Sequence, residues 1–101
     1  MAYKIKLLPA AYNDLINAGK WYNTQREFLG DEFKTEINSE IERLSNNPEH
    51  YQIYFKELRQ TVVKRFPYSI FFITDENLKQ VIIFGVLHNS RNPRVISGRV
   101  K

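Results

Sequence analysis

The hydrophobic side chains change their spacing near residue 50, and this change constrains the fold more than any other feature of the sequence. Before that point, apolar residues return every three or four positions, which is typical of helices that bury one face. After it, apolar residues fill short runs bounded by turn-forming residues, which is typical of strands. A chain of 101 residues has the size of one domain, so both halves must share one core. We therefore expect a single domain of the α+β class over residues 1–101.

The chain is predicted to begin with a strand that leads into a helix. Residues 3–7 alternate apolar side chains with Lys4 and Lys6, as in an edge strand whose lysines face water. Pro9 stops this strand and suits the first position of a helix, which we expect to end near residues 24–25. The buried face of that helix is predicted to be Ala11, Leu15, Ala18 and Tyr22.

A second helix is predicted after a short connection through Phe28-Leu29-Gly30. Asp31 is the expected N-cap, and the run Asn46-Asn47-Pro48 is the expected end. Because the connection is so short, the two helices should pack antiparallel as an αα-hairpin. Its buried stripe is predicted to be Phe33, Ile37, Ile41 and Leu44. Its acidic row, which we expect to be solvated, is Glu32, Glu36 and Glu40.

Three strands are predicted in the second half, over residues 58–65, 68–73 and 80–87. Pro67 separates the first two, and the polar residues 75–77 form a turn before the third. Such short turns imply an antiparallel meander. The last strand is apolar on both faces, so it should be central and covered on both sides. The order β-α-α-β-β-β then gives an antiparallel sheet covered by the αα-hairpin, in two layers.

Several kinds of chemistry are excluded by what the chain lacks. It has no cysteine, which excludes disulfides, thiolate zinc sites, iron–sulfur clusters and cysteine nucleophiles. His50 and His88 lie far apart and the four glycines are isolated, so we find neither a histidine metal motif nor a glycine-rich phosphate loop. A serine nucleophile elbow is also missing. We therefore expect no metal and no cofactor.

The apolar stretches are short, which bears on the compartment. The longest, residues 81–87, is far below the length of a membrane-spanning helix. The first six residues lack the apolar core of a secretory signal. We therefore expect a cytoplasmic protein that does not bind a membrane.

The net charge of +4 is distributed unevenly. Residues 1–54 carry six Lys and Arg against eight Asp and Glu, a balance of −2. Residues 55–101 carry nine against three, a balance of +6. Positive charge concentrated in one half favours binding to a polyanion or an acidic protein, although solubility alone also explains such a surplus.

Candidate functional residues gather in this basic half. Arg59, Lys64 and Arg65 lie on the first predicted strand of the meander, and we expect Arg59 and Arg65 on one face of it. His88 and Arg91 follow the last strand, where a histidine can act as general base and an arginine can hold a phosphate. The alternative is a histidine that only caps a strand end, beside solvated arginines. Three aromatic residues are further candidates for partner contact: Tyr51, Tyr54 and Phe55.

Six short motifs are spread over most of the chain. They are Trp21-Tyr22 with Gln25, Leu29-Gly30 with Phe33, Asn47-Pro48, Leu58-Arg59, Lys64-Arg65-Phe66-Pro67-Tyr68 with Ile70, and His88-x-x-Arg91-x-Pro93. Together they resemble the RelE/ParE superfamily of toxins from bacterial type II toxin–antitoxin modules. The resemblance implies the same β-α-α-β-β-β fold and a role in growth inhibition and plasmid stabilisation. It also implies a cognate antitoxin as partner, in a toxin–antitoxin hetero-oligomer.

The resemblance leaves the molecular target open between two branches. ParE-like toxins inhibit DNA gyrase, whereas RelE-like toxins cleave messenger RNA at the ribosome with Lys, Arg and a C-terminal tyrosine. This chain has no tyrosine after Tyr68, and Ser69 stands where the nucleases usually have an arginine. Arg91 does match the nucleases, and His88 would replace the missing base. The motifs favour the ParE-like branch, with the ribonuclease as the alternative and an inactive antitoxin-binding module as a third possibility.

Overall fold

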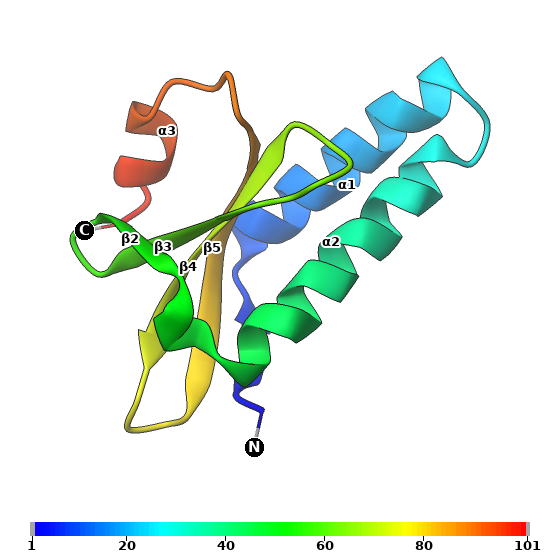
Figure 1. Cartoon of the computed structure of the whole chain (residues 1–101). Coiled ribbons are helices and arrows are strands. Elements are labelled where there is room, and N and C mark those ends of the chain that lie inside the picture. The colour runs from blue at the N-terminus through cyan, green and yellow to red at the C-terminus, as the bar shows by residue number, and fades with distance from the viewer. Residues whose placement is uncertain (1, 101) are drawn as a thin grey trace.

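The computed structural model describes residues 2–100. Its elements are β1 (Lys4–Leu7), α1 (Pro9–Gln25), α2 (Leu29–Asn46), the 3-10 turn η1 (Pro48–His50), β2 (Gln52–Phe55), β3 (Leu58–Val62), β4 (Tyr68–Asp75), β5 (Gln80–His88) and α3 (Arg94–Ser97). Figure 1 shows the α1–α2 hairpin along one face of the sheet and the short α3 on the other side. The predicted α+β class and order are confirmed, with β2 and α3 added to them.

The sheet has the strand order β1-β5-β4-β3-β2. The predicted meander is confirmed, because β3, β4 and β5 pair antiparallel in sequence. β1 is an edge strand as expected, but it runs parallel to β5, from Lys4 opposite Gln80 to Leu7 opposite Ile83. The sequence did not predict this parallel pairing, since a hydrophobic period carries no information about the direction of a distant partner. β2 forms the other edge, antiparallel to β3.

The helical hairpin buries the two apolar stripes that the sequence predicts. All eight predicted stripe residues are buried against one face of the sheet, at no more than 9% exposure. The helices approach closely where Gly19 meets Gly30, because a Cβ on Gly30 would collide with the Gly19 carbonyl oxygen. A smaller cluster on the opposite face joins Leu58, Phe71 and Leu87 to Ile96 of α3. β5 is therefore covered on both faces, as predicted.

The start of α2 differs from the prediction. Phe28, not Asp31, precedes the helix, and its backbone is left-handed with φ 66°. Asp31 and Glu32 lie in the first turn, where their charge favours the positive end of the helix dipole. Asn23 of α1 supplies the missing acceptor, since its Oδ1 receives the Gly30 N–H at 2.7 Å. The prediction was wrong because the acceptor comes from the neighbouring helix and not from the local sequence.

The acidic row on α2 is only partly solvated, because Glu32 and Glu36 remain about a third exposed whereas Glu40 is buried. Glu40 is only 8% exposed, accepts a 2.7 Å hydrogen bond from the Thr61 hydroxyl, and pairs with Arg43. Glu32 accepts hydrogen bonds from Arg26 and from Arg65, so it is also engaged. The expectation was wrong at Glu40 because Thr61 of β3 meets its carboxylate in the folded chain, and it was incomplete at Glu32 because Arg26 and Arg65 from two loops donate to it.

Candidate functional site

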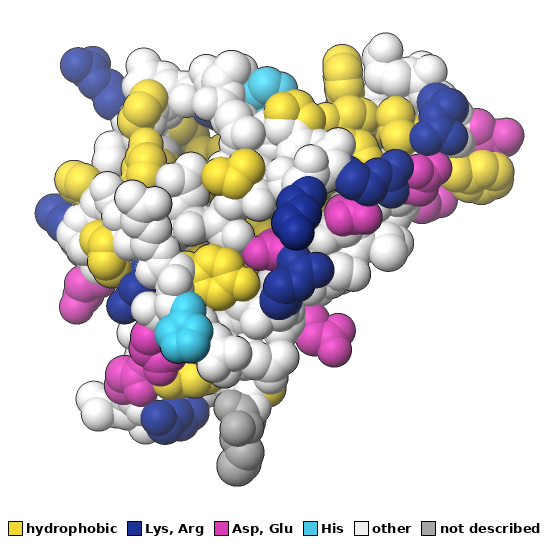
Figure 2. Space-filling model, viewed as in Figure 1, with side chains coloured by type: hydrophobic (Ala, Val, Ile, Leu, Met, Phe, Trp, Pro, Cys, Tyr) yellow, Lys and Arg dark blue, Asp and Glu magenta, His cyan; other side chains and the backbone are white. Residues whose placement is uncertain are grey.

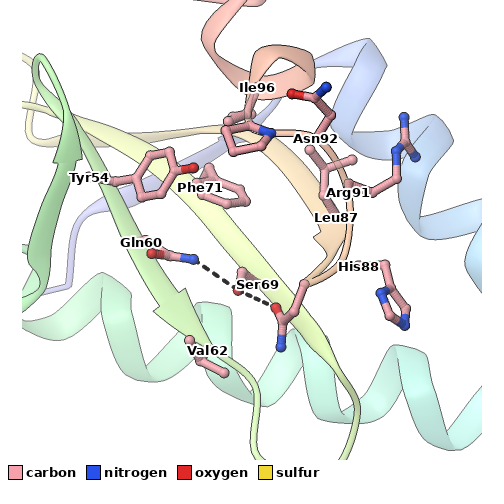
Figure 3. Close-up of a pocket in the computed structure, with 12 residues that line it drawn as sticks. Tyr54, Gln60, Val62, Ser69, Phe71, Leu87, His88, Arg91, Asn92 and Ile96 are labelled. Carbon is pink, nitrogen blue, oxygen red and sulfur yellow. Dashed lines mark hydrogen bonds between the residues drawn. The ribbon is translucent and has the colours of Figure 1, made fainter.

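A cleft of about 210 Å³ opens beside the end of β5, on the face that carries α3 (Figure 3). Its apolar wall includes Phe71, Leu87 and Ile96. We call it the sheet cleft, and its complete lining is Tyr54, Gln60, Val62, Ser69, Phe71, Leu87, His88, Asn89, Arg91, Asn92, Pro93 and Ile96. The loop after β5 thus joins β2, β3 and β4 around one hollow, as expected for a loop carried by a rigid sheet.

A hydrogen-bonded chain of three side chains crosses this cleft. The Gln60 amide donates to the Ser69 hydroxyl at 3.1 Å, and that hydroxyl donates to the Asn89 side-chain oxygen at 2.6 Å (Figure 3). Ser69 is 1% exposed, and both of these bonds engage its single oxygen. Ser69 therefore connects the two amides and is not available as a reacting group.

A second hollow, also of about 210 Å³, lies between α1 and the end of β5. We call it the α1–β5 groove, and its lining is Asp14, Asn17, Ala18, Trp21, Tyr68, Val86, Leu87, His88 and Arg91. His88 and Arg91 line both hollows, so they stand between them. In Figure 3 both side chains point away from Gln60 and Ser69, toward the side where α1 lies.

The imidazole of His88 is held in one orientation. Its Nδ1 accepts the backbone N–H of Ser90 at 3.0 Å and lies 2.8 Å from the Ser90 hydroxyl. The ring also packs edge-on against Tyr68, with centroids 5.3 Å apart. A backbone N–H can only donate, so Nδ1 must carry a lone pair and the neutral ring must hold its proton on Nε2. His88 thus presents a donor, not a free basic nitrogen.

Arg91 is positioned by the turn after β5, where its backbone N–H donates to the His88 carbonyl at 2.9 Å. Its side chain is exposed. Within residues 2–100, no carboxylate pairs with its guanidinium group. Burial raises the pKa of the neighbouring Tyr68, and the positive charge of Arg91 opposes that rise. Arg91 is therefore a free cation at the boundary of the two hollows.

The other three basic candidates lie elsewhere. β3 ends at Val62, so Lys64 and Arg65 fall in the loop before β4. The prediction that they lie on a strand, with Arg59 and Arg65 on one face of it, was wrong. Arg59 donates to the backbone carbonyls of Glu49 and Tyr51, at 3.1 and 2.6 Å. Lys64 is exposed.

Arg65 is part of an ion-pair network on the hairpin. It donates to Glu32 at 2.8 Å and lies 3.6 Å from Glu36. The hydrogen bond from Arg65 lowers the pKa of Glu32, and the nearby Arg26 lowers it further. Figure 2 shows Lys and Arg side chains mixed with Asp and Glu over this part of the molecule. The structure therefore brings His88 and Arg91 together, but not Arg59 or Arg65 with them.

The three aromatic candidates belong to a strand that the sequence did not predict, or lie just before it. Tyr51 packs on Phe72 of the main core, with ring centroids 5.7 Å apart. Tyr54 of β2 lines the sheet cleft and packs on Phe71 at 5.1 Å. Phe55 lines a separate shallow hollow with Tyr54 and α3. Only Tyr54 therefore reaches the site.

Sequence reasoning missed the pair formed by Asp14 and Arg99. Arg99 donates to both carboxylate oxygens of Asp14, at 2.6 and 3.1 Å, and to the Phe84 carbonyl at 3.1 Å. Asp14 also accepts the Val86 N–H at 3.0 Å. β1 ends opposite Ile83, so these two side chains occupy edge groups of β5 where a neighbouring strand would otherwise pair. No local sequence signal marks this pair, since the residues lie 85 positions apart.

Two further properties bear on the chemistry of the site. Across the described part of the chain, no group of three or more His, Cys, Asp or Glu side chains is placed to hold a metal ion. In the same residues, no helix has the length and apolar character needed to span a membrane.

Comparison with known proteins then gives the family. Among solved structures, the chain is similar to the chromosomal ParDE system of P. aeruginosa, with TM-score 0.76, 15% identity, and coverage of 86% of this chain and 96% of that one. It is also similar to the RelBE2 complex of Mycobacterium tuberculosis (TM-score 0.64, 16% identity, coverage 90% and 95%). A third similar structure is the intact RelBE complex of E. coli (TM-score 0.69, 12% identity, coverage 89% and 100%).

At such low identity these likenesses show the fold alone. No curated protein matches the sequence. A family model described as the ParE toxin of the type II toxin–antitoxin system, parDE, matches residues 5–93. That match spans most of the chain, including β2 to β5, all of β1 except Lys4, and the loop with His88 and Arg91. The chain therefore belongs to the ParE toxin family of type II toxin–antitoxin systems.

Proposed function

We propose that this toxin inhibits bacterial growth by acting on DNA gyrase in the cytoplasm and does not cleave messenger RNA. The observation that carries the choice is the Ser90 N–H bound to His88 Nδ1. It leaves the neutral imidazole with its proton on Nε2, so no nitrogen of His88 is free to accept a proton from a ribose hydroxyl.

The rest of the sheet cleft supports the same choice. The described residues that line it include no Asp, Glu or Lys, so His88 is the one side chain among them that commonly serves as a general base. Arginine stays protonated and is a poor base. Ser69 occupies the position where the resemblance places an arginine in the nucleases, and it is engaged between Gln60 and Asn89. The cleft can therefore bind a ligand but has no acid and base pair for phosphodiester cleavage.

A cognate antitoxin is the second part of the proposal. The similar solved structures are toxin–antitoxin systems and complexes. We expect the antitoxin to be encoded by a short acidic reading frame next to this gene and to form a hetero-oligomer with the toxin. Of the basic candidates, we propose Arg91 and Lys64 for partner contact, since the side chains of Arg59 and Arg65 already have acceptors within the molecule.

The test uses purified toxin in two assays run side by side. We expect it to inhibit DNA supercoiling by gyrase, to leave ribosome-bound messenger RNA intact, and to lose its effect when the antitoxin is added. The variant His88→Ala should leave the RNA result unchanged, because His88 cleaves nothing. If instead the wild type cleaves messenger RNA and His88→Ala reduces cleavage about 100-fold, the ribonuclease function is correct and the gyrase proposal is wrong. Harmless expression without antitoxin would point to an inactive binding module.

A further inference from the structure

The α1–β5 groove contains two hydrogen-bond donors that the protein itself does not use. One is the Nε2–H of His88, whose orientation is set by Ser90 and Tyr68. The other is the guanidinium group of Arg91. No hydrogen bond or ion pair within residues 2–100 engages either donor. A donor pair that includes a permanent cation is suited to an oxyanion, which accepts from both.

The surroundings favour one carboxylate on a protein over the phosphates of a nucleic acid. Nucleic-acid grooves need several cations along the backbone, whereas among residues 2–100 Arg91 is the only Lys or Arg that lines this groove. The Asp14 carboxylate in the groove is already paired with Arg99, so this pair adds no free positive charge for a second phosphate. Trp21, which is 56% exposed, and Ala18 give it an apolar side where a neighbouring hydrophobic residue can pack.

The edge of β5 limits how such a segment can bind. Asp14 accepts the Val86 N–H and Arg99 donates to the Phe84 carbonyl, so these edge groups are already paired. The Asp14–Arg99 pair is itself largely buried, with side-chain exposures of 13% and 23%. A bound segment therefore lies in the groove through its side chains and does not add a strand at Phe84 and Val86.

We propose that the α1–β5 groove is the docking site for an acidic peptide segment of the antitoxin. An Asp or Glu carboxylate of that segment binds Arg91 and the His88 Nε2–H, and an adjacent apolar side chain packs against Trp21. This inference rests on the proposed antitoxin partnership and adds to it a surface and a recognition chemistry. Charge complementarity identifies the occupant, because a free cation meets an expected acidic partner.

The experiment titrates full-length toxin with the antitoxin encoded by the adjacent reading frame. Trp21 is the only tryptophan of the chain, so in toxin labelled with nitrogen-15 its indole N–H gives one signal that reports on the groove. We expect that signal and the Arg91 side-chain signal to shift on binding, while the Val86 amide remains protected from exchange. Arg91→Gln should weaken binding by about 10- to 100-fold.

Two further variants make the result specific. Arg94→Gln removes the same charge from α3 outside the groove, and we expect it to change the affinity less than about 2-fold, as for a charge on the rim of an interface. His88→Phe keeps a flat ring against Tyr68 but lacks the donor, so it should weaken binding by about 5- to 10-fold, the loss of one hydrogen bond.

Each other outcome would overturn the docking site. If the antitoxin binds while the Trp21 signal stays in place and Arg91→Gln binds like the wild type, the partnership stands and this surface is wrong. Equal losses from Arg91→Gln and Arg94→Gln would mean that net charge matters and not the groove. If an oligothymidylate shifts the Trp21 and Arg91 signals and the antitoxin does not, the groove binds nucleic acid. If no complex forms, the docking site and the antitoxin partnership fail together.

Discussion

Glu40 and Thr61 form the most deeply buried polar contact between the hairpin and the sheet. The Glu40 side chain is nearly covered, and the Thr61 hydroxyl, 8% exposed as a residue, donates to it at 2.7 Å. A buried carboxylate that loses a donor keeps its desolvation cost with less compensation, and for Glu40 only the ion pair with the exposed Arg43 would remain. The contact therefore matters more for correct docking of α2 on β3 than its single hydrogen bond suggests.

Replacing Thr61 tests this directly. Thr61→Val keeps the shape but removes the donor, and we expect it to lower the free energy of unfolding by about 1–3 kcal/mol. Thr35→Val is the matched control, because the Thr35 hydroxyl donates to the Asp31 carbonyl on the exposed side of α2. That control should stay within about 0.5 kcal/mol of the wild type. Urea denaturation measures both, and equal losses would contradict the special role of the Thr61–Glu40 bond.

The hairpin as an element depends on two glycines that are not equivalent. A Cβ on Gly30 would meet the Gly19 carbonyl oxygen, which cannot withdraw without parting the helices. It would also meet the Asn23 side chain, whose withdrawal would break its hydrogen bond to the Gly30 N–H. A Cβ on Gly19 would meet the end of the Lys34 side chain at 2.8 Å, and that flexible side chain can move. The close approach of α1 and α2 is therefore set at Gly30.

Alanine at each glycine separates these cases. Gly30→Ala should destabilise the protein by about 1–3 kcal/mol through overpacking. Gly19→Ala should be neutral or stabilise by up to about 1 kcal/mol, because alanine is the better helix former. Thermal unfolding followed by circular dichroism compares them. A Gly30→Ala variant as stable as Gly19→Ala would show that the helices can separate without cost.

Across the whole molecule, part of the charge asymmetry is used internally. Two arginines of the basic half form ion pairs with the helices: Arg65 pairs with Glu32 of α2, and Arg99 pairs with Asp14 of α1. These pairs link the acidic half of the chain to the basic half. Less positive charge is therefore available for partners than the sequence indicates. Arg91 is one basic residue that has no acidic partner within residues 2–100. The overall field still favours an acidic partner, although fewer residues provide it.

The internal pairing predicts a pH dependence of stability. Arg65 lowers the pKa of Glu32 in the folded state, so folding is favoured by the ionised form. The contribution of the Arg65–Glu32 pair to the free energy of unfolding is fully present above the pKa of Glu32 in the unfolded chain. It is lost as the pH falls through the lower pKa of Glu32 in the folded protein. Arg65→Gln should therefore cost stability at about pH 7 and almost none at about pH 2. Lys64→Gln, at an exposed neighbour, is the control, and a constant difference between pH values for Arg65→Gln would contradict the pairing.

The elements follow largely from the sequence because they depend on local spacing. Hydrophobic spacing and turn residues predicted three features that are all present: the buried stripes of α1 and α2, Pro9 at the start of α1, and the β3–β4–β5 meander. The candidate pair His88 and Arg91 was also predicted, since both lie in one loop after a strand. Local spacing contains this information because neighbours in a helix or strand are neighbours in the chain.

Only the tertiary structure decided the rest, because it depends on residues far apart in sequence. Packing between distant segments sets four features: the parallel direction of β1, the burial of Glu40, the acceptors of Arg59 and Arg65, and the Asp14–Arg99 pair on β5. The tautomer of His88 also follows only from the structure, because the Ser90 N–H that donates to Nδ1 sets it. A hydrophobic period shows which residues are buried, whereas the partner of each polar group is set by the three-dimensional fold.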